Sequence, residues 1–295
     1  MRVISIFGGS GFIGTELVHE LVKKDFEIRL FTRKKNIYPL HNIPKIKLIQ
    51  LKSDKNLKND LIGSDIIIDL VGILHEKKGI TFNDIHSTRL EMISRIACDL
   101  NVKRFIHIGA LGASVKAPSR YLQSKAKGEN HVKRVCSKLA WTIYKPSIVF
   151  GEHDKFINLF HTIITFIPII GLVSPYAMFQ PIWVKDLVDI IVTSIDDKKT
   201  FQKTFNMAGP TCYSFMDIIK LISHYKKKRI LILPLGKRIS YMLVTLMELL
   251  PFKIITRDNL RSMSIDSTVK INDTYQFKST LMDLGTYLAS KNKNI

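Results

Sequence analysis

The stretch Gly8-Gly9-Ser10-Gly11-Phe12-Ile13-Gly14 follows a short apolar run, Val3–Phe7, and opens an amphipathic segment, Phe12–Lys24. Glycines three residues apart suit a strand–loop–helix turn. The first permits the tight turn, the second lets a pyrophosphate approach the backbone, and the third allows close helix packing. The helix N-terminus offers free N–H groups and partial positive charge to phosphates. Residues 8–14 are therefore predicted to bind a dinucleotide, with a ligand-free glycine turn as the alternative.

The first 150 residues alternate short β-branched runs with amphipathic segments, which is the pattern of βαβ units. The expected strands are Val3–Phe7, Glu27–Phe31, Lys47–Leu51, Asp65–Leu70, Arg104–Ile108 and Ala140–Tyr144. The expected helices are Phe12–Lys24, Phe82–Leu100 and Tyr121–Val135. This order predicts an α/β fold, a Rossmann-type doubly wound parallel sheet, with ligands at the carboxyl ends of its strands.

After Phe150 the alternation becomes less regular. We expect a dinucleotide-binding domain over residues 1–151 and a smaller, mixed α/β C-terminal lobe over 152–295, with parts of 175–210 packing back on the sheet. The expected elements are strands Phe179–Val184 and Thr204–Met207, helices Asp186–Ile195, Ser214–His224 and Ile239–Leu250, and a last helix beyond Ser279. The helix ending at Pro251 is expected to pack into the lobe.

The end of the second strand indicates which dinucleotide is bound. It reads Phe31-Thr32-Arg33-Lys34-Lys35 and lacks the carboxylate that an NAD-selective site uses on the adenine ribose. Arg33 and Lys34 suit a 2′-phosphate, which favours NADP(H) and leaves NAD(H) as the alternative. A basic surface turn without a ligand is the other interpretation.

Two further segments are placed to complete this site. Asp54 follows the third strand, where a carboxylate can accept a hydrogen bond from the adenine amino group. Leu70-Val71-Gly72 follows the fourth strand, where the backbone passes beside the cofactor ribose. A purely structural role is the alternative for both. No metal site is expected.

Tyr121 and Lys125 form a Y-x-x-x-K pattern on the helix after the fifth strand. The four-residue spacing places phenol and ammonium on one helical face. An ammonium favours the phenolate, so the pair suits acid–base work on a carbonyl, and Lys125 can also bind the nicotinamide ribose. We take both residues as candidates for catalysis and cofactor binding, against a chance occurrence of a common pattern.

Several sequence motifs resemble those of one protein family. Lys145-Pro146-Ser147-Ile148-Val149-Phe150-Gly151 is similar to the R-P-x-x-V-[YF]-G segment of extended short-chain dehydrogenases, and the stretch 179–187 to their F-x-x-V-x-D-[VL] segment. "FGGSGFIG" at 7–14, "LVGIL" at 70–74 and "ALGA" at 110–113 resemble the atypical members related to the 39-kDa accessory subunit of respiratory complex I. The resemblance implies NADPH binding, a cofactor contact at Pro146 and a place beside a membrane complex without established turnover.

The chain departs from the catalytic members at one position. The resemblance implies a Ser or Thr near the end of the fifth strand, but Ile108-Gly109-Ala110-Leu111 carries no hydroxyl. Ser114 lies further along the loop and is a poor substitute, and His86 lies near the position of the usual relay asparagine. Losing such a donor lowers a rate by about 10²–10³-fold. Whether the protein is an enzyme stays open.

Bulk properties bound the remaining possibilities. The formal charge is +20, from codon bias or from a functional basic face. Cys98, Cys136 and Cys212 show no pairing pattern and predict buried, unpaired thiols in a reducing compartment. The chain begins at its first strand, so we expect no presequence, a bacterial relative and a cytoplasmic location, with peripheral membrane contact as an alternative.

Three functions are carried forward. The first is an NADP(H)-binding accessory, assembly or stability factor of complex I or another membrane complex, at the cytoplasmic face. Its amphipathic segment Ile239–Leu250, flanked by Lys237, Arg238 and Lys253, could lie on an anionic membrane. The second is an oxidoreductase or epimerase acting on a small carbonyl or nucleotide-linked substrate. Nucleic-acid binding rests on charge alone and is disfavoured.

Overall fold

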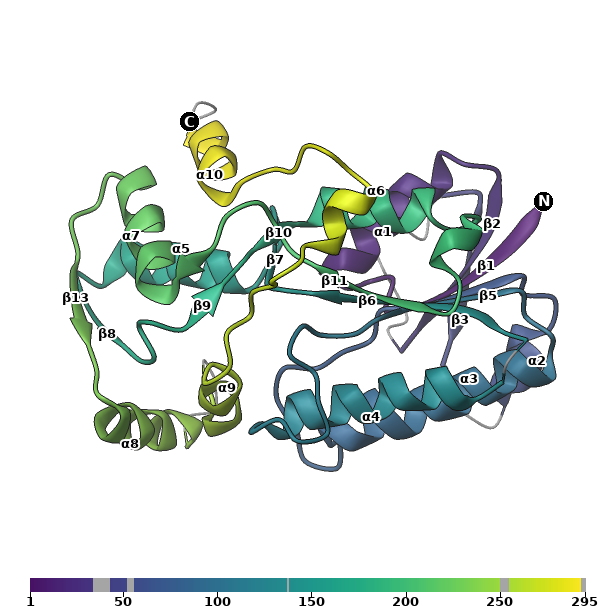
Figure 1. Ribbon diagram of the computed structural model, residues 1–295, viewed down its shortest axis with the longest axis horizontal. Coiled ribbons are helices and arrows are strands. Elements are labelled where there is room, and N and C mark those ends of the chain that lie inside the picture. The colour runs from purple at the N-terminus through teal and green to yellow at the C-terminus, as the bar shows by residue number, and fades with distance from the viewer. Residues whose placement is uncertain (34–42, 52–55, 137, 250–254, 293–295) are drawn as a thin grey trace. The chain divides into compact units, whose positions relative to one another are not determined.

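The computed structural model describes residues 1–33, 43–51, 56–136, 138–249 and 255–292 (Figure 1). Some residues singled out in the sequence lie outside these ranges: Lys34, Lys35, Asp54, Leu250, Pro251 and Lys253. The chain divides into two units, each treated separately below. Unit 1 comprises Met1–Gly109, Ser124–Lys145 and Leu187–Phe205; unit 2 comprises Ala110–Gln123, Pro146–Asp186 and Asn206–Ile295.

Unit 1 is built on a seven-stranded sheet with the order β11-β6-β5-β4-β1-β2-β3. Its strands are β1 (Arg2–Phe7), β2 (Phe26–Thr32), β3 (Ile46–Gln50), β4 (Ile66–Asp69), β5 (Arg104–Ile108), β6 (Ala140–Pro146) and β11 (Lys203–Met207). The pairs from β3 through β6 are parallel. The chain leaves β1 for β2 on one side and returns through β4 on the other, so the switch point lies at the carboxyl ends of β1 and β4. The predicted Rossmann-type fold is confirmed.

Helices cover both faces of this sheet, as Figure 1 shows for α1 and α6 on one face and α2, α3 and α4 on the other. Their bounds are α1 (Phe12–Val22), α2 (Leu57–Leu61), α3 (Arg89–Asp99), α4 (Arg120–Arg134) and α6 (Val184–Thr193). Because both faces are covered, the central strands are mostly buried, and all of Ile66–Asp69 is buried. Side chains of β4, β5, α2 and α3 share one hydrophobic cluster.

The predicted helix Phe82–Leu100 is divided into two parts. A π-helical segment, η3 (Asp84–Thr88), precedes α3. A Cβ on Gly128 of α4 would lie 1.9 Å from the carbonyl oxygen of His86, so the two segments pack backbone against backbone. Single π-turns often occur at functional sites, and this one carries His86.

Unit 2 contains three two-stranded sheets: β7 (Val149–Phe150) with β10 (Ile182–Trp183), β9 (Met178–Phe179) with β12 (Tyr213–Ser214), and β8 (Ile169–Leu172) with β13 (Leu231–Pro234). Its helices are α5 (Phe156–Phe166), α7 (Phe215–Tyr225), α8 (Lys237–Glu248), α9 (Arg257–Ser262) and α10 (Leu284–Asn292). Ser214 and Asp217 form a capping box that begins α7. The expected strand Phe179–Val184 is split because Pro181 follows Gln180 between β9 and β10.

Helix α8 does not pack as expected. Ser240 and Val244 are buried, whereas Ile239, Met242, Leu246 and Leu249 on the more apolar side are exposed. The prediction of a core-packed helix is therefore wrong for its described residues. None of the described helices is long and apolar enough to cross a membrane.

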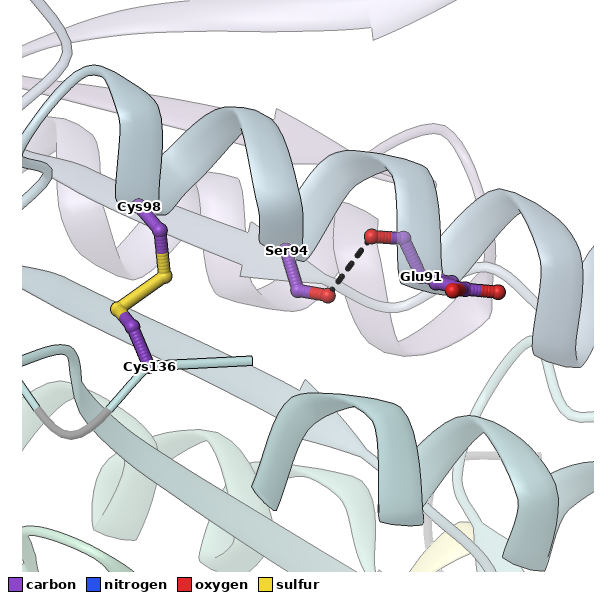
Figure 2. The surroundings of a disulfide bond; sticks show 4 residues. All are labelled: Glu91, Ser94, Cys98 and Cys136. Carbon is purple, nitrogen blue, oxygen red and sulfur yellow. Dashed lines mark hydrogen bonds between the residues drawn. A yellow bond between two sulfur atoms is a disulfide. The ribbon is translucent and has the colours of Figure 1, made fainter. Parts of the chain in front are cut away.

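The cysteine prediction is also wrong. Cys98 near the end of α3 forms a disulfide with Cys136, which follows α4 (Figure 2). Their separation of 38 residues gives no sequence pattern, and only the packing of α3 beside α4 brings the two Cα atoms to 6.4 Å. Cys212 is free but exposed rather than buried. Because two of the three thiols are paired, the cysteines no longer indicate a reducing compartment.

Candidate functional site

The glycine loop has the backbone that its spacing predicts. Gly8 has φ +80°, a conformation that side chains rarely adopt, and its carbonyl accepts the N–H of Gly11 at 2.9 Å. A Cβ on Gly14 would lie 2.3 Å from the Gly8 carbonyl oxygen and 2.5 Å from Gly9 Cα. Gly14 is therefore required by the loop itself, because α1 begins so close to its own preceding turn.

Helix α1 begins at the loop without a side-chain cap. Gly11 is the N-cap residue, and its carbonyl accepts bonds from the backbone and hydroxyl of Thr15. The first turn carries no acidic residue. The N–H groups and partial positive charge at this terminus suit a phosphate, and the loop leaves no Cβ in its path at residue 11. The loop therefore fits the pyrophosphate of a dinucleotide.

The end of β4 lies against this loop. The N–H of Leu70 donates to the carbonyl of Phe7 at 2.9 Å. A Cβ on Gly8 would approach Leu70 C at 3.0 Å and Val71 N at 3.1 Å. The structure thus brings together the loop and the Leu70-Val71-Gly72 segment, which the sequence assigned to the same site.

Arg33 directly follows β2 and is exposed. The parallel register pairs Phe7 with Phe31, so Gly8 and Arg33 follow neighbouring strands at the same sheet edge. The rings of Phe7 and Phe31 stack at 4.5 Å between centroids. Lys34 and Asp54, the other predicted adenine-side residues, lie outside the described residues.

Lys125 lies beside the β4 segment. A Cβ on Gly72 would be 3.6 Å from Lys125 Nζ. Nζ is buried and donates to the carbonyl of Ile108 at 2.9 Å. Burial lowers the pKa of Lys125, and the charges of Asp69 and Glu129 oppose that shift.

His86 ties the same segment to α4. Its Nε2 accepts the N–H of Ile73 at 3.0 Å, so the ring proton belongs on Nδ1, which lies 2.9 Å from Ser124 Oγ. Burial, with a further contribution from the Lys125 charge, lowers the pKa of His86 to about 2. The neutral ring holds the backbone after Gly72 in place. The sequence singled out His86 only by its neighbourhood.

The structure contains a buried ionic cluster that was not predicted from the sequence. The carboxylate of Asp69, at the end of β4, accepts hydrogen bonds from Arg89 Nη1 at 2.9 Å and from His107 Nδ1 at 3.1 Å. Burial would raise the pKa of Asp69, but Arg89 and His107 outweigh it and hold the pKa well below its usual range. Arg89 also lies over the ring of Phe7, 4.9 Å from its centroid. An aspartate closing the apolar run Ile66–Ile68 was the available signal.

Tyr121 and Lys125 occupy the same helix, α4, but belong to different units. In unit 2 the buried carboxylate of Asp258 accepts the backbone N–H groups of Arg120 at 2.8 Å and Tyr121 at 3.0 Å. This carboxylate satisfies free donors in the first turn of α4. Because Asp258 lies 137 residues from Tyr121 in the sequence, no local pattern predicts this contact.

The position expected to carry a hydroxyl is apolar. The Ala110 methyl group is buried in a cluster with Ala117 and Leu122. Ser114 is exposed, and its hydroxyl accepts the N–H of Lys116 at 3.2 Å within the local turn. Pro146, the predicted cofactor contact, ends β6, and its carbonyl accepts the N–H of Leu111 at 3.0 Å.

Comparisons with known proteins agree with this geometry. Residues 8–155 match the family described as NAD(P)H-binding. NADH dehydrogenase [ubiquinone] 1 alpha subcomplex subunit 9, mitochondrial, of Mus musculus is 27% identical over 90% of this chain and 73% of its own length. The protein of the same name from Arabidopsis thaliana is 25% identical over 92% and 71%.

A solved structure shows the same fold. UDP-glucuronic acid 4-epimerase from Bacillus cereus, determined with a UDP-sugar analogue and NAD, superposes with a TM-score of 0.75 at 16% identity, covering 99% of this chain and 98% of the epimerase. At this identity the likeness concerns the fold alone.

Proposed function

Because the chain belongs to the NAD(P)H-binding family, we propose that it holds NADP(H) and serves as an accessory, assembly or stability factor of a respiratory membrane complex at the cytoplasmic face, with little or no turnover. The family match directly supports a nicotinamide dinucleotide as the cofactor. The choice of NADP(H) over NAD(H) is the part that we propose. The observation that carries the proposal is Lys125, whose buried ammonium lies beside Gly72 while position 110 offers only a buried methyl group.

The geometry of the glycine loop and of the segment after β4 supports the proposed cofactor contacts. Residues 8–14 take the pyrophosphate, and Leu70-Val71-Gly72 passes beside a ribose. Within unit 1, Lys125 holds the nicotinamide ribose. Tyr121 and Pro146 are the candidates that the sequence offers for the nicotinamide end.

The adenine end carries the preference for NADP(H). Arg33 and Lys34 bind the 2′-phosphate, and the Asp54 carboxylate accepts a hydrogen bond from the adenine amino group. Arg33 supports this assignment because it is exposed at the carboxyl edge of the sheet, where a guanidinium can bind phosphate bidentately.

The partner proposal rests on the relatives. The mouse and Arabidopsis proteins carry the name of an NADH dehydrogenase subunit, and they align with most of this chain. We therefore assign this protein a respiratory NADH dehydrogenase as its partner complex. Low turnover follows from Ala110, since no hydroxyl at that position can bond a substrate carbonyl.

One experiment tests cofactor and partner together. The purified protein is denatured and the released nucleotide identified by mass spectrometry, and tagged protein is then used to capture partners from detergent-solubilised membranes. We expect NADP(H) and subunits of the respiratory complex. Release of NAD(H) alone would overturn the cofactor assignment, and capture of no respiratory subunit would overturn the partner assignment.

An oxidoreductase or epimerase is the second candidate, because Tyr121 and Lys125 are both retained on α4. Its test is consumption of NADPH with a library of small carbonyls and nucleotide-linked sugars. Sustained turnover that requires Tyr121 would establish it in place of the accessory role.

A further inference from the structure

Helix α8 turns its most apolar face away from the rest of unit 2. Ile239, Met242, Leu246 and Leu249 are 53%, 61%, 57% and 80% exposed, and their spacing of three and four residues places them on one face. The opposite face is the packed one, because Ser240 and Val244 are buried. A surface helix normally turns its apolar stripe toward the core.

The strand before α8 exposes apolar side chains too. Leu231 and Leu233 on β13 are exposed, and Ile169 on β8 is exposed at the register position opposite Leu231. Only Leu235 and Gly236 separate β13 from α8. We define the apolar surface as Ile239, Met242 and Leu246 of α8, Leu249 at its C-terminal cap, and Leu231 and Leu233 of β13.

Basic residues flank this surface in the sequence. Residues 226–249 include six basic residues and one acidic residue. Five of the basic ones are exposed: Lys227, Lys228, Arg229, Lys237 and Arg238. The single acid, Glu248, is paired with Arg257 at 2.6 Å, and within the part of the chain that the structure describes none of those five cations forms an ion pair.

A groove of about 720 Å³ lies between α7 and β13, lined by Ile232 and Pro234 on the face of β13 opposite to Leu231 and Leu233. Four basic side chains, Lys220, His224, Lys228 and Arg229, line it together with apolar Met216 and Ile232.

We propose that the apolar surface docks unit 2 directly on an anionic lipid bilayer, with α8 in the plane of the interface. An exposed apolar stripe flanked by cations of one sign is the arrangement by which helices lie at a bilayer surface. Lipid phosphates complement the five cations, and the apolar side chains of α8 and its C-terminal cap enter the acyl boundary. This deepens the membrane location in the proposed function and rests on it for its setting.

The test uses the full-length protein and lipid alone. Flotation compares phosphatidylcholine vesicles containing one-third phosphatidylglycerol with vesicles of phosphatidylcholine only. We expect binding to the anionic vesicles, weaker binding to the neutral ones, and release at high salt. The double variant Met242→Ser/Leu246→Ser should bind at least about tenfold more weakly, because two inserted side chains are lost.

Matched control variants distinguish binding through this surface from non-specific binding to the vesicles. Ile271→Ser replaces an apolar residue elsewhere in unit 2 that is even more exposed, at 78%, and this variant should bind like the wild type. Lys237→Ala/Arg238→Ala should weaken anionic binding, and Lys198→Ala/Lys199→Ala, at exposed positions of unit 1, should not. Unchanged circular dichroism confirms that each variant is folded.

No binding to anionic vesicles, or equal binding by Met242→Ser/Leu246→Ser and the wild type, would overturn the proposal. Because no cofactor or protein is present in the assay, these results would leave the proposed function standing. Failure to capture a respiratory complex with intact vesicle binding would instead overturn the partner assignment alone.

Discussion

The Lys125 ammonium donates a 2.9 Å hydrogen bond to the backbone carbonyl of Ile108, at the end of β5. This bond anchors a buried cation beside Gly72, where the β4 segment meets the glycine loop. Burial disfavours the charge, and Asp69 and Glu129 support it. A lysine held in this way can bind a ribose hydroxyl without acting as an acid or base.

Replacing Lys125 should therefore weaken NADPH binding. We expect Lys125→Ala to cost about 1–3 kcal/mol, the range for a lost charged hydrogen bond. Isothermal titration calorimetry measures the change. Lys127→Ala, at an exposed position of the same helix, is the control and should bind normally. Equal affinities for the two variants would remove Lys125 from the site.

Arg33 should determine the preference for NADPH. Arg33→Asp is expected to invert the order of NADPH and NADH affinities, because a carboxylate repels the 2′-phosphate and accepts the ribose hydroxyls of NADH. Lys198→Asp makes the same change of charge at an exposed position and should leave the order intact. If the wild type binds both cofactors equally and Arg33→Ala changes nothing, the assignment of Arg33 is wrong.

The loop can be tested without a large change in backbone strain. Gly11 has φ −84° and ψ 176°, which a β-branched residue adopts. A Cβ at this position would lie 3.1 Å from the Gly8 carbonyl oxygen, a close contact that a shift of a few tenths of an ångström relieves. Gly11→Val should therefore fold yet lose the dinucleotide, since its side chain occupies the space of the pyrophosphate. Differential scanning fluorimetry with and without NADPH checks both points. A folded Gly11→Val protein that still carries cofactor would contradict the site.

Stability should fall in mild acid because of His86. Its pKa is lowered to about 2 in the fold from 6.5, so below 6.5 the unfolded chain binds a proton that the folded chain refuses. Stability is thus complete above pH 6.5 and decreases as the pH falls toward 2. The loss reaches about 2 kcal/mol near pH ~5, at about 1.4 kcal/mol per unit. Denaturant unfolding should show a smaller pH dependence in His86→Gln but not in His19→Gln, an exposed control.

Catalysis is tested at Tyr121 and Ala110. Tyr121→Phe should leave NADPH binding and partner association nearly intact, because the phenol hydroxyl has no substrate carbonyl to protonate. Ala110→Ser should introduce the missing donor and with it slow carbonyl reduction. Wild-type turnover above about 1 s⁻¹ that disappears in Tyr121→Phe would retire the accessory role.

The sequence alone determined the Rossmann-type sheet and its glycine loop. Both depend on patterns within short windows: alternating apolar runs, and glycines three residues apart whose backbone needs are local. The six strands predicted in the first 150 residues were confirmed within two residues at each end. The Gly8 backbone likewise agrees with its predicted role.

Tertiary structure alone decided the contacts between distant residues. Asp258 caps α4 from 137 residues away, and Cys98 meets Cys136 only because α3 packs beside α4. The outward face of α8 was equally hidden, since helical periodicity shows that an apolar stripe exists but not which way it turns. Such contacts depend on how elements pack in space, and no local pattern encodes that packing.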